Sequence, residues 1–120
     1  MADEITLTMR MLVSKGNLVH KEEPGIQSIT LNGANGTGGI QNIGTSAELI
    51  TMGDTGTAGW AFMRNTDPTN FVELGTSTTT FVAFAKLKAG EACMFRLGTN
   101  APAARANFAA INLQYFILSD

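Results

Sequence analysis

Short segments in which apolar and polar residues alternate set the fold class of this 120-residue chain. From Ile5 to Val13 every second residue is apolar, which is the period of a strand that buries one face. Similar segments recur at intervals of about 8–12 residues, with turn-forming clusters between them. The alternation predicts an all-β, single-domain β-sandwich over 1–120, jelly-roll-like, with eight to ten short antiparallel strands. Residues 1–20 are expected to supply either an outer strand or an arm.

The positions of the strands follow from the same alternation. After the first strand, at 4–13, strands are expected at 26–31, 40–45, 48–52, 59–65, 71–74, 78–87, 91–97, 103–107 and 108–118, and 18–21 is a candidate for a short return strand. Residues 59–65 and 71–74 are predicted to pair as a β-hairpin. Strand 91–97 is predicted to return from a tight turn at 88–91, where Gly90 can take a positive φ.

Glycine and proline mark the expected breaks. Residues 22–25 read Glu-Glu-Pro-Gly and are predicted to end a short strand. Residues 32–39 contain four glycines and two asparagines, which predicts a flexible loop. Segment 103–107 is too short to nucleate a helix and is predicted to be an edge strand. Segment 108–118 becomes apolar on both faces, which predicts a strand that is central or lies at an interface.

The chain carries few charges for its size. Charged residues make up 15% of it, against about 25% in a typical soluble protein, and the net charge is −2. No basic tract exists that would neutralise phosphates, so nucleic acid is not expected as a partner. Two explanations stay open: a neutral, polar surface on a monomer, or a surface that lies partly against another subunit. We favour the second and expect a homo-oligomer.

The residues available for catalysis or metal binding are sparse. His20 is the single histidine and lies in a charged segment, so we expect it on the surface. Cys93, the single cysteine, lies in an apolar strand, where we expect an inert, partly hydrophobic role and a raised thiol pKa. A cupin-type metal site needs two or three histidines. We therefore predict no catalytic residues, no cofactor and no metal, and no apolar run is long enough for a membrane span.

Charged residues within apolar strands of the C-terminal half are candidates for contacts between subunits. Such a residue faces solvent or forms half of an ion pair across an interface. Trp60 is a further candidate, either at a subunit interface or on a sugar-binding face. The predicted interface residues are Trp60, Arg64, Glu73, Arg96 and Arg105.

The second half of the chain resembles small structural proteins of tailed bacteriophages. The resemblance rests on the segments Gly-Trp-Ala-Phe-Met-Arg-Asn at 59–65, Asn-Phe-Val-Glu-Leu-Gly at 70–75, Phe-Val-Ala-Phe at 81–84 with Leu-Lys-Ala-Gly-Glu at 87–91, and Leu-Gln-Tyr-Phe-Ile-Leu at 113–118. It covers about the last 65 residues. Residues 1 to about 50 do not match this pattern.

This resemblance implies a virion component of the capsid decoration, or cement, type. Such proteins are often trimeric β-sandwiches that sit on the outside of the capsid and brace neighbouring subunits of the major capsid protein. It implies synthesis in the host cytoplasm and no enzymatic activity. The alternative is a phage tail or fibre module that binds a host glycan, with a concave patch around Trp60.

Overall fold

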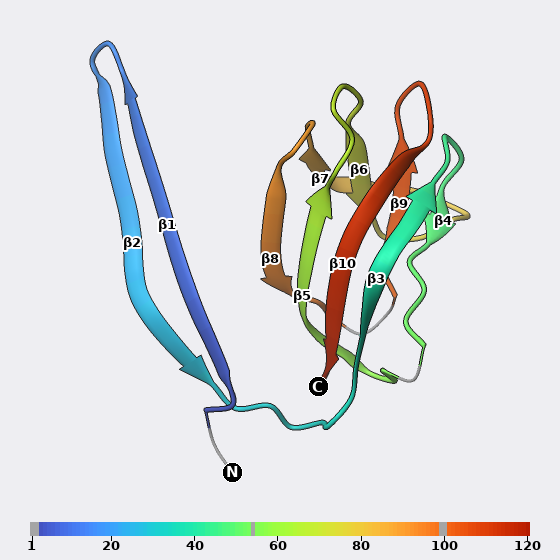
Figure 1. Ribbon diagram of the computed structural model, residues 1–120, viewed down its shortest axis with the longest axis horizontal. Coiled ribbons are helices and arrows are strands. Elements are labelled where there is room, and N and C mark those ends of the chain that lie inside the picture. The colour runs from blue at the N-terminus through green and yellow to red at the C-terminus, as the bar shows by residue number, and fades with distance from the viewer. Residues whose placement is uncertain (1–2, 54, 99–100) are drawn as a thin grey trace. The chain divides into compact units, whose positions relative to one another are not determined.

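The computed structural model describes residues 3–53, 55–98 and 101–120, and its regular structure is entirely β-strand (Figure 1). The chain divides into two compact units, Met1–Asn32 and Gly33–Asp120. Strands β1 and β2 form a sheet of their own in the first unit. The remaining described strands belong to the second unit, which we call the sandwich. The sandwich therefore spans 33–120 and not the whole of 1–120 as predicted from the sequence, because β1 and β2 pair with each other.

The first unit is an antiparallel hairpin of β1 (Ile5–Lys15) and β2 (Leu18–Ile29). The strand predicted at 4–13 is confirmed as β1. The predicted break at 22–25 is wrong, because β2 continues through it. Glu22 of β2 lies opposite Met11 of β1, whereas Gly25 of β2 lies opposite Met9. The residues of β2 between Glu22 and Gly25 therefore form a bulge.

The sandwich has two four-stranded antiparallel sheets. Its strands are β3 (Gly36–Ile43), β4 (Glu48–Leu49), β5 (Ala58–Asn65), β6 (Val72–Gly75), β7 (Ala83–Leu87), β8 (Ala92–Arg96), β9 (Ala103–Ala106) and β10 (Ile111–Ser119). We call β3-β10-β5-β8 the front sheet and β4-β9-β6-β7 the back sheet, as they lie in Figure 1. The all-β prediction with short antiparallel strands is confirmed.

Alternation along each strand directs every second side chain into the space between the two sheets. In β10 the odd-numbered residues from Ile111 to Ser119 are buried, and their even-numbered neighbours are exposed or half-buried. Large fully buried side chains come from both sheets and from a connecting segment: Ile43, Ile50, Met63, Val72, Leu74, Ile111, Leu113 and Ile117. Burial of these apolar side chains is the main stabilising contribution of the sandwich.

Strands that are adjacent in sequence mostly lie in different sheets. β5 belongs to the front sheet and β6 to the back sheet, so the hairpin predicted from 59–65 and 71–74 is wrong. The turn at 88–91 likewise connects β7 in the back sheet to β8 in the front sheet. Local alternation identifies the buried face of a strand, but it does not identify the strand beside it.

A buried asparagine stabilises the corner where the chain passes from β5 to β6. Asn65 is fully buried, and its Nδ2 donates to the carbonyl oxygens of Asn70 at 2.8 Å and Leu87 at 3.0 Å. Its Oδ1 accepts the backbone N–H of Asp67 at 2.9 Å. One side chain therefore links the β5–β6 loop to the end of β7.

Two further predictions are corrected by the sheet order. Residues 36–39, predicted as part of a loop, form the first half of β3. Segment 103–106 is not an edge strand, because β9 pairs with both β4 and β6. The central position predicted for the last strand is confirmed, since β10 lies between β3 and β5.

Asp67 in the β5–β6 loop gives the sandwich a predicted sensitivity to acid. Its Oδ2 accepts the backbone N–H groups of Asn70 at 2.6 Å and Thr69 at 3.0 Å. These two bonds, that from Asn70 first, lower the pKa of Asp67 below its ordinary value of 3.8. A carboxylate with a lowered folded-state pKa contributes stability above its ordinary pKa, and this contribution is lost as the pH falls through the folded-state value.

We therefore expect the urea concentration at the unfolding midpoint to decrease as the pH is lowered below about pH 4. This decrease should be steeper for the wild-type protein than for Asp67→Asn. Urea unfolding in steps from about pH 6 to about pH 2.5 measures both curves. Parallel curves would show that Asp67 does not contribute to the acid sensitivity.

Candidate interaction surface

A row of apolar residues crosses the outer surface of the front sheet. Gly38, Phe116, Phe62 and Met94 lie opposite one another on β3, β10, β5 and β8. Phe116 is 48% exposed and Met94 is 38% exposed. Four neighbouring strands thus present an uncharged row to the outside of the sheet.

Further apolar residues extend this row along the strands. Ile40, 67% exposed, lies opposite Gln114, and the half-buried Leu118 lies opposite Gly36. We call the following set the apolar face: Gly36, Gly38, Ile40, Phe62, Met94, Phe116 and Leu118. Contiguous exposed apolar groups of this kind mark interaction surfaces in soluble proteins.

Glycines in β3 give the ring of Phe116 room to lie close to the sheet. A Cβ atom on Gly36 would lie 3.0 Å from the Phe116 ring. A Cβ on Gly38 would meet the same ring and would lie 2.5 Å from the carbonyl oxygen of Tyr115. The next glycine, Gly39, has a φ of 146°, which favours glycine. The Phe116 ring therefore lies over Gly36 and Gly38 of β3.

The outer surface of the back sheet has a different chemistry. Glu73 lies between Lys86 and Arg105 on the neighbouring strands, and the Arg105 Nη2 lies 2.9 Å from the Glu73 Oε1. The Arg105 guanidinium lies 4.3 Å from the centroid of the Phe81 ring, and the Lys86 ammonium lies 4.5 Å from that of Phe71. These charges have partners within the sandwich, as is usual for a solvated face.

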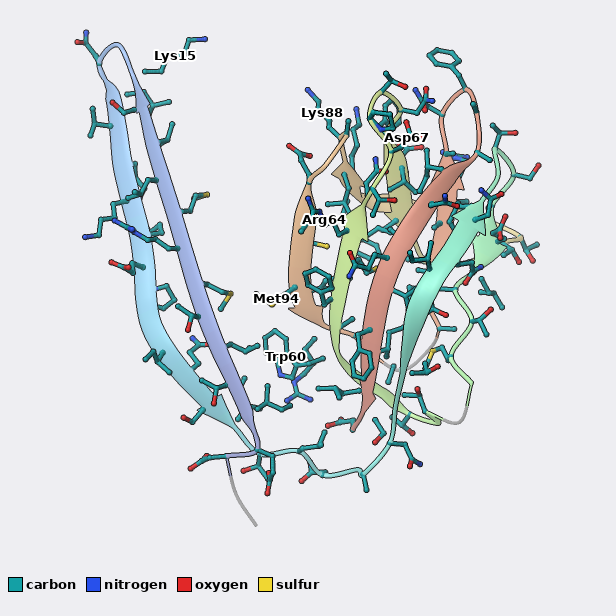
Figure 2. The ribbon with its side chains drawn as sticks, in the orientation of Figure 1. Lys15, Trp60, Arg64, Asp67, Lys88 and Met94 are labelled. Carbon is teal, nitrogen blue, oxygen red and sulfur yellow. The ribbon has the colours of Figure 1, made fainter. Side chains whose placement is uncertain are left out.

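The predicted interface residues fall on both outer surfaces of the sandwich. Glu73 and Arg105 form the ion pair of the back sheet, whereas Trp60, Arg64 and Arg96 lie on the front sheet. Figure 2 labels Trp60 and Arg64 on β5, together with Met94 of the apolar face. The structure therefore does not bring the five residues together, and their role in subunit contacts stays a prediction.

Within the front sheet, two of the predicted residues form one group at the end of the apolar face. Trp60 lies opposite Arg96, whose guanidinium carbon is 5.6 Å from the centroid of the indole ring. The Arg96 Nη1 lies 2.9 Å from the Asp120 Oδ1. Arg64 is exposed on the other side of the apolar row, opposite Ala92 and Gln114. The charges of the front sheet thus flank the apolar row.

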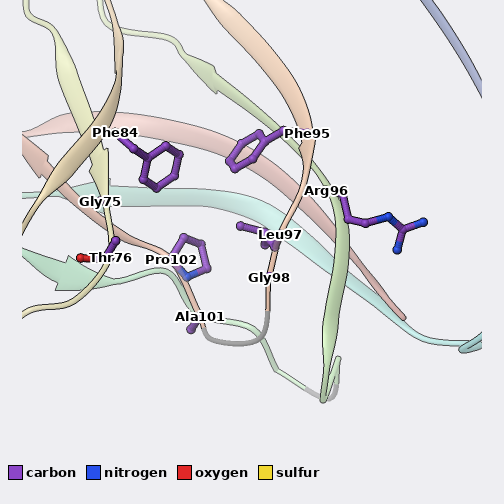
Figure 3. A pocket seen from close by; sticks show the side chains of 9 residues that line it. All are labelled: Gly75, Thr76, Phe84, Phe95, Arg96, Leu97, Gly98, Ala101 and Pro102. Atoms are coloured by element: carbon purple, nitrogen blue, oxygen red, sulfur yellow. The ribbon is translucent and has the colours of Figure 1, made fainter.

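A pocket of about 370 Å³ lies beside the β8–β9 connection (Figure 3). The rings of Phe84 and Phe95, 5.7 Å apart, line it together with Leu97 and Pro102. Figure 3 shows the Arg96 side chain pointing away from it, and the lining does not include Trp60. Among the described residues that line it, Thr76 supplies the one hydroxyl. The described part of the lining therefore does not show convergent polar groups around Trp60 of the kind that a glycan site needs.

The two residues considered for catalysis, Cys93 and His20, belong to different units of the chain. Cys93 is half-buried against the core, and burial raises the pKa of its thiol. His20 is exposed on the hairpin, with its Nε2 2.7 Å from the Glu22 Oε1. Across residues 3–53, 55–98 and 101–120, no three His, Cys, Asp or Glu side chains gather where they could hold a metal ion. Nor do these ranges contain a helix with the length and hydropathy of a membrane crossing.

No protein-family model, curated protein or solved structure matches this chain. Its function is therefore inferred from its own residues and surfaces.

Proposed function

We propose that this chain is a non-enzymatic virion structural protein of a tailed bacteriophage, a capsid decoration or cement protein. It acts as a homotrimer on the outside of the capsid, where it bridges and stabilises subunits of the major capsid protein. The apolar face carries this proposal. A protein that works by covering other subunits needs such a face, whereas a protein that stays alone in water does not.

The strand order supports a jelly-roll topology within this proposal. From β3 to β10, every connection passes from one sheet to the other except β6–β7, which stays in the back sheet. Two four-stranded sheets ordered β3-β10-β5-β8 and β4-β9-β6-β7 agree with the double Greek key of an eight-stranded jelly roll. Capsid proteins, lectins and cupins use this topology. The uncharged row that crosses the front sheet favours the first of these uses.

The hairpin supports the proposal as a second surface for partners. Two paired strands alone are marginally stable in water. The hairpin nevertheless exposes large apolar side chains on both β1 and β2, namely Met11, Leu12, Leu18, Val19 and Ile26. This distribution suits an arm that crosses to a neighbouring subunit and orders there.

The mechanism follows from contact area and copy number. Each copy in a trimer adds its own contact to the capsid, so weak contacts sum to strong attachment. Because the trimer binds the assembled lattice and not free coat protein, its binding energy stabilises the assembled capsid by mass action. Scarce surface charge suits this role, since few ions must be desolvated when two surfaces meet.

Cosedimentation tests this function. Purified protein is mixed with DNA-free capsids of the phage that encodes it and centrifuged through a sucrose cushion, with free coat protein as the control. We expect saturable pelleting with capsids and a higher thermal disassembly temperature of the decorated shells. Protein that stays in the supernatant at saturating capsid concentration would refute the proposal. A glycan array then tests the tail or fibre alternative, which predicts weak, millimolar sugar binding.

A further inference from the structure

We propose that the peptide between Asn32 and Gly33 is a site of covalent self-modification, at which the asparagine side chain is converted to aspartate or isoaspartate. The inference does not depend on the proposed function, because it concerns the chemistry of the chain itself. Asn32 is the last residue of the first unit, and Gly33 is the first residue of the sandwich. The modification therefore adds a negative charge to the segment of chain that joins the two units.

Two Asn-Gly dipeptides lie close together in the sequence, at 32–33 and at 35–36. Every other asparagine of the chain precedes a residue that has a side chain. The side-chain amide of an asparagine can react with the backbone nitrogen of the next residue. Glycine as the next residue favours this reaction, because it has no side chain in the way and allows a wide range of backbone angles. The sequence alone thus makes both dipeptides candidates.

The reaction balances without an oxidant, a reductant or a bound catalyst. The backbone nitrogen of Gly33 loses its proton and bonds to the Cγ of Asn32, while the bond from Cγ to the side-chain nitrogen breaks. That nitrogen takes up a proton and leaves as ammonia, and a succinimide ring remains. Water then opens the ring at one of its two carbonyl groups. One opening leaves aspartate, and the other leaves isoaspartate, whose main chain is longer by one methylene group.

The structure leaves the first dipeptide able to react. Asn32 is exposed and lies outside the strands. Within the part of the chain that the structure describes, neither Asn32 nor Gly33 takes part in a hydrogen bond. Ring closure requires rotation about ψ of Asn32, which turns its carbonyl group, and this rotation breaks no hydrogen bond. A Cβ on Gly33 would overlap the side chain of Ser119, so packing requires glycine at the position where it makes the amide reactive.

The structure restrains the second dipeptide. The backbone N–H of Asn35 donates to the Ser119 Oγ at 2.9 Å, and its carbonyl oxygen accepts the Ser119 N–H at 2.8 Å. Gly36 is the first residue of β3 and lies opposite Leu118 of β10. Rotation about ψ of Asn35 turns its carbonyl group away from Ser119 and disturbs this pairing. The lost hydrogen bonds are expected to slow ring closure at Asn35 by about tenfold or more.

Incubation of the full-length protein in mildly alkaline buffer tests this assignment. Samples are digested at intervals, and tandem mass spectrometry measures the conversion at each asparagine, while circular dichroism reports that the protein stays folded. The same incubation in concentrated urea is the control, because unfolding removes the hydrogen bonds to Ser119 but leaves the sequence unchanged. Asn32→Gln is the matched variant, since the longer side chain must close a larger and less favourable ring.

In the folded protein we expect conversion at Asn32 to be at least about tenfold faster than at Asn35. In urea we expect the two rates to become similar. In folded Asn32→Gln we expect conversion at 32 to be lost and the slow conversion at Asn35 to be unchanged. Equal rates at the two asparagines of the folded wild type would overturn the assignment. An absence of conversion at Asn32 in the folded protein would also overturn it.

Discussion

Replacing Asn65 with alanine is expected to lower the free energy of unfolding by about 2–4 kcal/mol. The side chain is fully buried and makes three hydrogen bonds at the corner between β5 and β6. Its loss leaves the carbonyl oxygens of Asn70 and Leu87 without this donor and the N–H of Asp67 without this acceptor. A buried polar group that loses its partner costs about 1–3 kcal/mol, and water entering the cavity recovers part of this loss.

Urea unfolding followed by the fluorescence of Trp60, the single tryptophan, measures the loss. Asn42→Ala is the matched control. The Nδ2 of this exposed residue donates to the Oδ1 of Asn112 at 3.1 Å, and its removal should change stability by no more than about 0.5 kcal/mol. Equal, small effects at both positions would show that the Asn65 hydrogen bonds do not stabilise the corner.

Asn65 also illustrates how far alternation predicts the fold. The two-residue period of a strand places Trp60, Phe62 and Arg64 on one face of 59–65. Asn65 therefore falls on the other face with Met63, which is buried. The strand and its two faces are therefore predictable. Whether β6 lies beside β5 or across the core from it depends on contacts distant in sequence, and for that reason the predicted hairpin is wrong.

The glycine-rich segment shows a second limit of local reasoning. Composition indicates a loop at 32–39, because glycine costs more conformational entropy in a strand than other residues do. The structure places 36–39 in β3, opposite the C-terminal part of β10. The need for glycine arises from Phe116, a residue about 80 positions away in the sequence. The segment alone does not carry this information.

The apolar face could be predicted only in part. The two-residue period of a strand places Phe62 and Phe116 each on the same face as polar residues of its own strand. The small number of charged residues in the sequence indicates a surface that is covered by another subunit. The row itself joins β10, β5 and β8, and its existence depends on their lateral order and register. The charged residues predicted at a subunit interface instead include Glu73 and Arg105, which form an ion pair with each other on the back sheet.

Replacing Gly38 with alanine is expected to destabilise the sandwich by about 1–3 kcal/mol, because the added methyl group has no space. Its Cβ would lie 2.5 Å from the carbonyl oxygen of Tyr115 and 3.1 Å from the Cα of Phe116. Both are backbone atoms, so rotation of the Phe116 ring does not relieve the contact. Either β3 or β10 must move, which weakens the pairing that joins β3 to the front sheet.

A graded series of alanine substitutions tests this explanation against a general effect of glycine replacement. At Gly36 the added Cβ would meet side-chain atoms of Phe116 at 3.0 Å and Leu118 at 3.3 Å, which can move, so we expect a smaller loss. At Gly44 the nearest atom is the Glu48 Oε2 at 3.6 Å, an ordinary contact, and we expect a change of no more than about 0.5 kcal/mol. Urea unfolding ranks the three variants. Equal losses at all three positions would refute the steric explanation, because the space for the added Cβ differs among them.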